Sequence, residues 1–256
     1  MDPINLLKSV PGEIAKEVYG DALSGVLKEA GKAGTDFAKT IRLVLFPLQI
    51  TGALQDRLAV FIDRSIRAVP IDKRIPPVPS LTLQVAERLK YQEDDIVAAM
   101  YMSLLSSAMS RDKVGRAHPA FVHLIAQLAP DEALLLQQLS NSDPCAYLRG
   151  HPRENKAVLK EERRESLQTA SLQYPAREKL LEILVRPEDL GQPDLIYTYI
   201  EHLVSLGLVS YTNEPWEGPF ASVRGQSAIQ NYRLHFIRLN EFGRLFHLAC
   251  LSAADH

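Results

Sequence analysis

Apolar residues recur at intervals of three and four over residues 54–69, with charged residues between them. This period predicts an amphipathic helix, because positions three and four apart share one face of an α-helix. Pro70 ends the pattern, and the IPPVP sequence at residues 75–79 predicts an extended segment, since each proline fixes φ and lacks an N–H donor. We therefore expect separate helices joined here by an extended connection.

Further helical patterns follow, and each has a recognisable start. Asp94 and Asp95 lie in the first turn of one of them, where carboxylates interact favourably with the positive end of the helix dipole. This helix is rich in alanine and serine, so neighbouring helices can approach it closely, and we predict that it is central. Two later helices open with Pro119 and Pro130, at the first helical position that proline tolerates. A helical core domain is predicted over residues 41–140.

The residue pattern differs before and after this predicted core domain. Residues 1–40 carry an amphipathic pattern broken by five glycines, and we predict an N-terminal arm that a partner surface orders. Residues 141–173 contain breaks and a mixed-charge cluster, which predict a linker. Residues 174–256 are predicted to form a winged-helix-like α+β domain, with an antiparallel β-hairpin between 208–212 and 231–239. The expected fold class is mainly α.

Composition narrows the classes of function. The 256 residues include 29 Lys and Arg against 31 Asp and Glu, a net charge of -2. This balance disfavours binding of nucleic acid through a broad surface, because phosphate neutralisation supplies most of that affinity. Cys145 and Cys250 are too few for a disulfide framework or a four-thiolate metal site, and we expect reduced, buried thiols.

The sequence also favours a cytoplasmic location. The first residues lack the basic start and apolar run of a signal peptide. The most apolar window, residues 43–54, is shorter than the ~20 residues of a spanning helix. Proline and glycine also interrupt it.

The sequence lacks the common catalytic motifs, but one segment is similar to a ribonuclease motif. There is no phosphate-binding loop, dinucleotide fingerprint, HExxH or nucleophile elbow, so we expect no cofactor and no metal. The RDKVGRAH sequence, from Arg111 to His118, is similar to the Arg-polar-x-His motif of the HEPN ribonucleases, in which guanidinium and imidazole act on the scissile phosphate. Because Pro119 favours an extended conformation at His118, we interpret His118 as a loop residue that caps the next helix. A ribonuclease using Arg111 and His118 stays an alternative.

The predicted winged-helix-like domain lacks the usual surface of a DNA reader. Its candidate recognition helix, residues 194–202, contains two acids and no Lys or Arg, although base edges and phosphates are contacted mainly by Arg, Lys, Asn and Gln. The expected wing is acidic around Trp216, with Arg224 and Arg233 nearby. We expect this domain to contact protein, and a nucleic-acid-binding regulator is the second alternative. Trp216 is either a contact anchor or a side chain that packs back onto the sheet.

The order of segments over residues 34–139 has a family resemblance. It consists of a helix LQDRLAVFIDRSIRAV, the IPPVPSLTLQVAERL segment, an acid-capped helix EDDIVAAMYMSLLSSAMS and the block HPAFVHLIAQLAPDEALLLQQL, with a looser match in the tail that ends LNEFGRLFHLACL. The HPAF sequence from His118 and the APDE sequence from Ala129 are its most specific parts. This order resembles the abortive infection alpha family of bacterial proteins. The SRDK sequence from Ser110 departs from the small, acidic turn that is common there.

The resemblance implies a role in limiting phage infection, through harm to or arrest of the infected cell, and it supplies no catalytic residues. We therefore expect a non-enzymatic protein whose partner is a phage component, a host component or a second copy of the chain. The N-terminal arm is the segment expected to contact another subunit or, peripherally, a membrane. The candidate functional residues are Arg111, His118, Trp216, Arg224 and Arg233.

Overall fold

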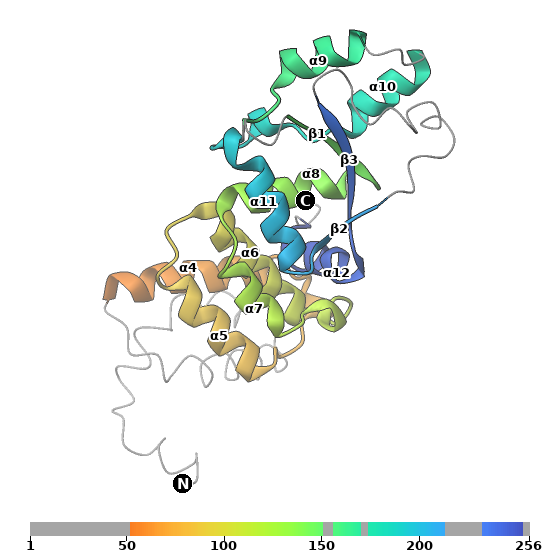
Figure 1. Ribbon diagram of the computed structural model, residues 1–256. Coiled ribbons are helices and arrows are strands. Elements are labelled where there is room, and N and C mark those ends of the chain that lie inside the picture. Colours follow the sequence, from red (N-terminus) through yellow and green to blue (C-terminus); the bar gives the residue numbers. More distant parts are fainter. Residues whose placement is uncertain (1–51, 151–155, 170–173, 213–231, 253–256) are drawn as a thin grey trace, which may run out of the picture. The chain divides into compact units, whose positions relative to one another are not determined.

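The structure is a computed structural model, which describes residues 52–150, 156–169, 174–212 and 232–252 (Figure 1). The predicted N-terminal arm, Trp216 and Arg224 lie outside these residues. The chain divides into two units between Ala126 and Gln127, and each unit is described by itself.

The described part of the first unit is helical. Its central element is α6, against which α4, α5 and α7 all pack, as its small side chains predicted. The elements are α4 (Gly52–Arg67), η1 (Ile71–Lys73), α5 (Pro79–Leu89), α6 (Asp95–Ala108), η2 (Val114–Arg116) and α7 (Ala120–Ile125), where η marks a 3-10 helix.

The start of α6 follows from its sequence. Asp94 is the N-cap, and its carboxylate accepts hydrogen bonds from the Ile96 and Val97 N–H groups at 2.9 and 3.0 Å. These two donors have no partner within the helix, so the cap satisfies them. Leu104 and Leu105, further along α6, are fully buried, and each such side chain stabilises the fold by about 2 kcal/mol.

The proline-rich connection is extended, as predicted. The Ile75 N–H donates to the Met109 carbonyl, and the Arg111 N–H donates to the Lys73 carbonyl, both at 2.9 Å. These bonds form an isolated antiparallel bridge between Arg74 and Ser110. The connection is therefore tied to the residues that follow α6.

The second unit surrounds a three-stranded antiparallel sheet of order β1-β3-β2. The predicted hairpin is confirmed, because β2 pairs with β3 in an antiparallel register. The mainly helical fold class with a small antiparallel sheet is confirmed as well. The elements are α8 (Pro130–Ser140), β1 (Cys145–Arg149), α9 (Lys160–Thr169), α10 (Tyr174–Ile183), η3 (Pro187–Asp189), η4 (Pro193–Leu195), α11 (Ile196–Ser205), β2 (Val209–Tyr211), β3 (Arg233–Leu239) and α12 (Glu241–Cys250).

The segment expected as a linker, residues 141–173, carries regular structure. It contains β1 and α9, and α8, which the sequence analysis placed in the helical core domain, falls in the second unit. The order of helices and strands is the one that suggested a winged helix. That resemblance stays a prediction, since residues 213–231, where the wing was expected, lie outside the described part of the chain.

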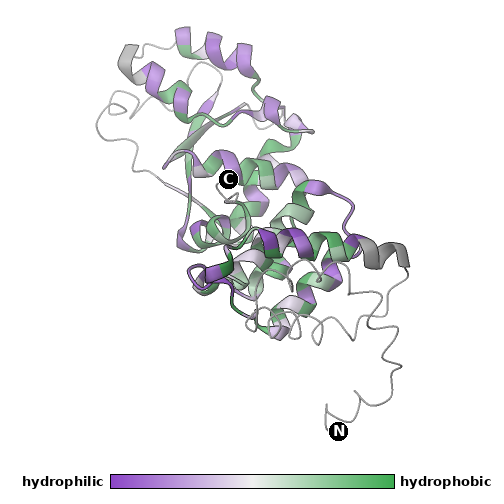
Figure 2. Ribbon diagram, turned by 180° about the vertical axis from the view of Figure 1, so that it is seen from behind, coloured by the Kyte–Doolittle hydropathy of each residue, from purple (hydrophilic) through white to green (hydrophobic). Residues whose placement is uncertain are grey.

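The sheet has packed elements on both faces. Figure 1 shows α9 and α10 on one side of it, and α8 and α12 on the other. On the face that α9 and α10 cover, buried side chains form a cluster. Helix α9 itself is hydrophilic over most of its length (Figure 2). This cluster consists of Ala146, Leu148, Val158, Leu167, Leu180, Leu184, Leu234 and Phe236.

The start of the last helix, α12, lies close to Gly207 and Leu208, which connect α11 to β2. Asn240 is the N-cap of α12, and its side chain accepts a hydrogen bond from the Gly243 N–H at 2.8 Å and donates one to the Gly207 carbonyl at 2.6 Å. Gly207 ends α11 with φ of 69°, a conformation that favours glycine. A Cβ atom on Gly243 would lie 1.9 Å from the Leu208 carbonyl oxygen, so this position also requires glycine.

Candidate functional site

His118 lies in the first unit, directly before α7. Its Nδ1 accepts a hydrogen bond from the Ala120 N–H at 3.2 Å, and its carbonyl accepts one from the Phe121 N–H at 3.0 Å. The imidazole also lies 5.6 Å from the Phe121 ring, between centroids. His118 therefore caps the start of α7, as we interpreted it from the sequence.

Arg111 lies on the exposed loop after α6. Its neighbour Asp112 forms an ion pair with Lys73 at 2.6 Å, across the bridge that ties this loop to the proline-rich connection. These contacts give the loop a structural role in the first unit. A ribonuclease function of Arg111 and His118 stays an untested alternative.

Arg233, the third candidate that the structure describes, lies at one end of the sheet. It is the first residue of β3, and its register partner is Arg149, the last residue of β1. The next pair on the same face is His235 with Tyr147, because side chains two positions apart point to one side of a strand. The sheet thus places two arginines directly opposite each other.

A row of aromatic rings lies next to these arginines. The Tyr147 and His235 rings are nearly parallel, with centroids 5.1 Å apart, and the Tyr211 ring of β2 lies 6.4 Å from His235. Tyr197 of α11 covers Tyr147, with centroids 6.1 Å apart. Burial, together with the hydrogen bond between the Tyr147 hydroxyl and Tyr211, raises the pKa of Tyr147 above its usual range. Tyr147 is therefore an interior residue of the row, whereas Tyr211 is 49% exposed.

The two arginines have different surroundings. The Arg149 guanidinium lies 5.2 Å from the centre of the Tyr197 ring and donates to Glu201 at 3.1 Å. Arg233 is exposed, and no ion pair or hydrogen bond engages its guanidinium in the described part of the chain. Burial, then the positive charges of Arg149 and Arg233, lower the pKa of His235. We call Arg149, Tyr211, Arg233 and His235 the sheet-end surface.

Helix α11, which lies at the place of a recognition helix, exposes no cation. Its exposed residues are Thr198, Glu201 and Ser205, and its buried face consists of apolar residues and tyrosines. The predicted lack of a basic recognition surface therefore extends to the face that α11 presents to solvent.

The APDE sequence has a structural explanation in the second unit. The two Asp131 carboxylate oxygens accept hydrogen bonds from the N–H groups of Gly191 and Gln192 at 2.8 and 2.9 Å, and from the Tyr199 hydroxyl at 3.1 Å. Burial and this hydrogen bond raise the pKa of Tyr199 to about 12. One aspartate therefore connects α8, the loop before α11 and α11 itself.

Glu132 makes a second connection from α8 to α11. It is 2% exposed, and it accepts a hydrogen bond from the Ala129 N–H at 2.8 Å, which satisfies a free donor at the start of α8. Its other oxygen lies 2.7 Å from His202 Nδ1. Together with Asp131, it holds α11 against the first turn of α8.

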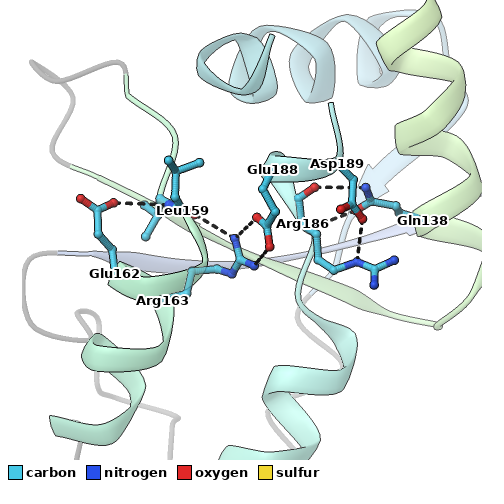
Figure 3. Close-up of polar contacts among 8 residues, drawn as sticks. Gln138, Leu159, Glu162, Arg163, Arg186, Glu188 and Asp189 are labelled. Atoms are coloured by element: carbon cyan, nitrogen blue, oxygen red, sulfur yellow. Dashed lines mark hydrogen bonds and ion pairs between the residues drawn. The ribbon is translucent and has the colours of Figure 1, made fainter. Parts of the chain in front are cut away.

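Arg163 is a buried charge that the sequence analysis missed within the mixed-charge cluster (Figure 3). Its two terminal nitrogens donate to the two carboxylate oxygens of Glu188 at 2.6 and 2.7 Å, and one of them also donates to the Val158 carbonyl at 3.0 Å. Only 8% of the Arg163 side chain is exposed. The pair fixes the start of α9 to η3.

The same close-up shows a second link to η3, from α8. The Gln138 amide accepts a hydrogen bond from the Arg186 N–H at 2.8 Å and donates one to the Arg186 carbonyl at 3.1 Å (Figure 3). Gln138 thereby satisfies both backbone groups of a loop residue. These polar contacts tie η3 and the residue before it to α8 and to the start of α9.

The cysteines are buried free thiols, as predicted. Burial raises the pKa of Cys145 to about 11 and also raises that of Cys250. Since the thiolate is the reactive form, neither thiol is activated as a nucleophile. Within the described ranges, no group of three or more His, Cys, Asp or Glu residues is arranged to hold a metal ion.

None of the helices in the described part of the chain is long and apolar enough to span a bilayer. This finding covers residues 52–150, 156–169, 174–212 and 232–252 only.

Comparison with known proteins gives one match. The family model described as abortive infection alpha matches residues 51–250, which include every helix and strand of both units given above. Neither the curated proteins nor the solved structures contain a match to this chain.

Proposed function

Since the chain belongs to the abortive infection alpha family, we propose that it limits phage propagation by contacting a protein of the phage or of the host cell. In this proposal the protein acts in the cytoplasm through binding and catalyses no reaction itself. The family match supports an abortive-infection role, and the surface of the second unit supports a protein partner.

The observation that carries the choice of partner is the exposed face of α11. Thr198, Glu201 and Ser205 occupy this face, so a nucleic-acid backbone would meet an acid and two hydroxyls in place of cations. The favourable free energy of phosphate binding comes mainly from Lys and Arg. A protein partner has no such requirement.

The charges elsewhere on the second unit support the same choice. Arg186 pairs with Asp189 at 3.0 Å, and Arg238 pairs with Asp143 at 3.2 Å. Arg244 also pairs with Asp143. Cations that already have acidic partners form no continuous basic track, whereas surfaces of mixed charge are common in protein interfaces.

We further propose that residues 1–40 provide the second contact, to another copy of the chain or peripherally to a membrane. The amphipathic pattern of this segment, which five glycines interrupt, supports the idea. Limited proteolysis with and without phage lysate tests it. We expect phage lysate to change the protection of this segment, because its exposure would be the toxic step. Equal protection in both samples would contradict that step.

The experiment for the proposed function compares phage plaquing and host survival. Cells that express the chain are compared with cells whose gene carries an early stop codon. We expect fewer plaques and death of the infected cells when the chain is made. Unchanged plaquing over a broad phage panel would contradict the proposal.

Binding to DNA is measured on the purified chain to test the alternative. A nucleic-acid regulator would bind with an affinity that falls steeply between about 50 and 200 mM salt. The proposed function predicts no such binding. DNA affinity with this salt dependence would favour the regulator.

A further inference from the structure

We propose that the sheet-end surface, formed by Arg149, Tyr211, Arg233 and His235, binds an acidic segment of the protein partner. This inference rests on the proposed function in one respect, that the partner is a protein. It adds the chemistry of that partner and the residues that contact it.

Among the described residues, no acid compensates the charge of Arg233. Arg233 and Arg149 are directly opposite in an antiparallel pair, and like charges in that position are destabilising. Glu201 compensates Arg149 at 3.1 Å, but in the described part of the chain the Arg233 guanidinium has no acid beside it. An added carboxylate between the two guanidinium groups would relieve the repulsion.

Arg149, in contrast, is already held in place by two neighbouring side chains. Its guanidinium stacks 5.2 Å from the centre of the Tyr197 ring and bonds to Glu201, and the exposed fraction of its side chain is 35%. An arginine that is oriented before binding loses less conformational entropy when it gains a ligand. One guanidinium of the pair is therefore preorganised, and the other is free to close on the ligand.

The sheet-end surface also contains two aromatic side chains. Tyr211 is 49% exposed at the end of β2, and its ring lies beside the half-buried His235. Tyrosine and arginine are the residue types that most often contribute strongly to protein interfaces. The sheet end thus offers apolar contact area next to two sites for anionic oxygens.

The number of charges distinguishes an acidic polypeptide from a nucleic acid. The surface has two arginines, and Glu201, 57% exposed, lies beside one of them. Two guanidinium groups can pair with one or two carboxylates, whereas a phosphodiester backbone brings a charge with every nucleotide and needs a longer cationic track.

The test uses the purified full chain and a fluorescent peptide rich in Glu and Asp, with binding followed by anisotropy. Arg233→Glu is expected to lower the affinity at least tenfold, and Arg233→Gln to lower it less. Arg164→Glu is the matched control, because Arg164 is an exposed arginine on α9 of the same unit. Circular dichroism checks that each variant is folded.

A second readout locates the peptide on the wild-type chain. The imidazole signals of His235 are followed by NMR and assigned with His235→Gln. We expect them to shift on addition of peptide while those of His247 stay unchanged, since His247 lies on α12 and its pKa is lowered by burial alone.

Three results would overturn the inference. They are no binding of the peptide, equal losses in Arg233→Glu and Arg164→Glu, and binding of a single-stranded oligonucleotide that depends on Arg233 while the acidic peptide does not bind. Each is obtained on purified protein, so it leaves the plaquing test of the proposed function unaffected.

Discussion

Removal of the Glu188 carboxylate is predicted to destabilise the second unit strongly. Glu188 accepts two charge-assisted hydrogen bonds from Arg163, at 2.6 and 2.7 Å. In Glu188→Ala the buried guanidinium keeps only the Val158 carbonyl as a partner. Breaking a fully buried ion pair costs about 3–5 kcal/mol. Since 28% of the Glu188 side chain is exposed, water replaces part of the loss, and we expect about 2–3 kcal/mol.

Urea unfolding followed by circular dichroism measures this free energy. Arg163→Met is expected to cost a similar amount, and a double-mutant cycle with Glu188→Ala to show a coupling of about 1–3 kcal/mol. Arg164→Met, on the same helix but exposed, is the control and should change the free energy of unfolding by about 0.5 kcal/mol or less. Equal effects of Arg163→Met and Arg164→Met would refute the reasoning, because they would show that burial of Arg163 has no energetic consequence.

The same pair predicts a dependence of stability on pH. Burial alone would raise the pKa of Glu188, but the hydrogen bonds from Arg163, a backbone hydrogen bond and the positive charges of Arg163 and Arg186 together outweigh it and hold this pKa below its ordinary value of 4.5. A carboxyl whose pKa is lower in the folded state stabilises the protein above its ordinary pKa, and this contribution is lost as the pH falls through the folded value. Glu188→Gln should therefore reduce the loss of stability on acidification below about pH 4.5. An unchanged pH profile in this variant would contradict the role of Glu188.

Two further substitutions test packing and capping. Gly243→Ala is expected to destabilise the second unit by about 3 kcal/mol or more, because its Cβ would meet the Leu208 carbonyl oxygen at 1.9 Å. Gly115→Ala, with nothing within 4 Å of the added Cβ, is the control in thermal unfolding, and similar melting temperatures for both would contradict the close approach. Glu132→Ala should cost about 2–3 kcal/mol, since it leaves a helix-start N–H and His202 without their partner. A cost below about 0.5 kcal/mol in urea unfolding would show that this buried carboxylate does not hold α11 to α8.

The sequence predicted those helix starts and strands that depend on residues close to each other in the chain. Asp94 marked the start of α6, and Pro130 marked the start of α8. The alternation of residues predicted the pairing of β2 with β3. Each of these features depends on residues a few positions apart, so the chain itself contains the information.

Features with a distant cause could not be predicted in the same way. Strand β1 is short, and it pairs with β3, which lies far along the chain; Cys145, for example, is opposite Ile237. No nearby residue indicates this pairing, and the sequence therefore predicted a linker here. Arg163 is one of six consecutive charged residues, and its burial depends on Glu188, 25 positions later.

The candidate site shows the same limit. The sequence predicts Arg233 as a candidate residue, but the binding role proposed for it depends on Arg149, which no motif in the sequence indicates. Only the register of β1 and β3 places the two arginines opposite each other. Tyr211 and His235 join them because β2 lies on the other side of β3.

The central claim is that this chain limits phage propagation through a protein contact at the sheet end. Its most direct test is the efficiency of plaquing, together with survival of infected cells, for strains that make the wild-type chain, Arg233→Glu, Arg164→Glu or a chain with an early stop codon. The account predicts that the wild type and Arg164→Glu lower plaquing and that infected cells die, whereas Arg233→Glu behaves like the stop codon. Equal plaquing in the wild-type and stop-codon strains would contradict the phage-defence role, and full protection by Arg233→Glu would contradict the contact at the sheet end.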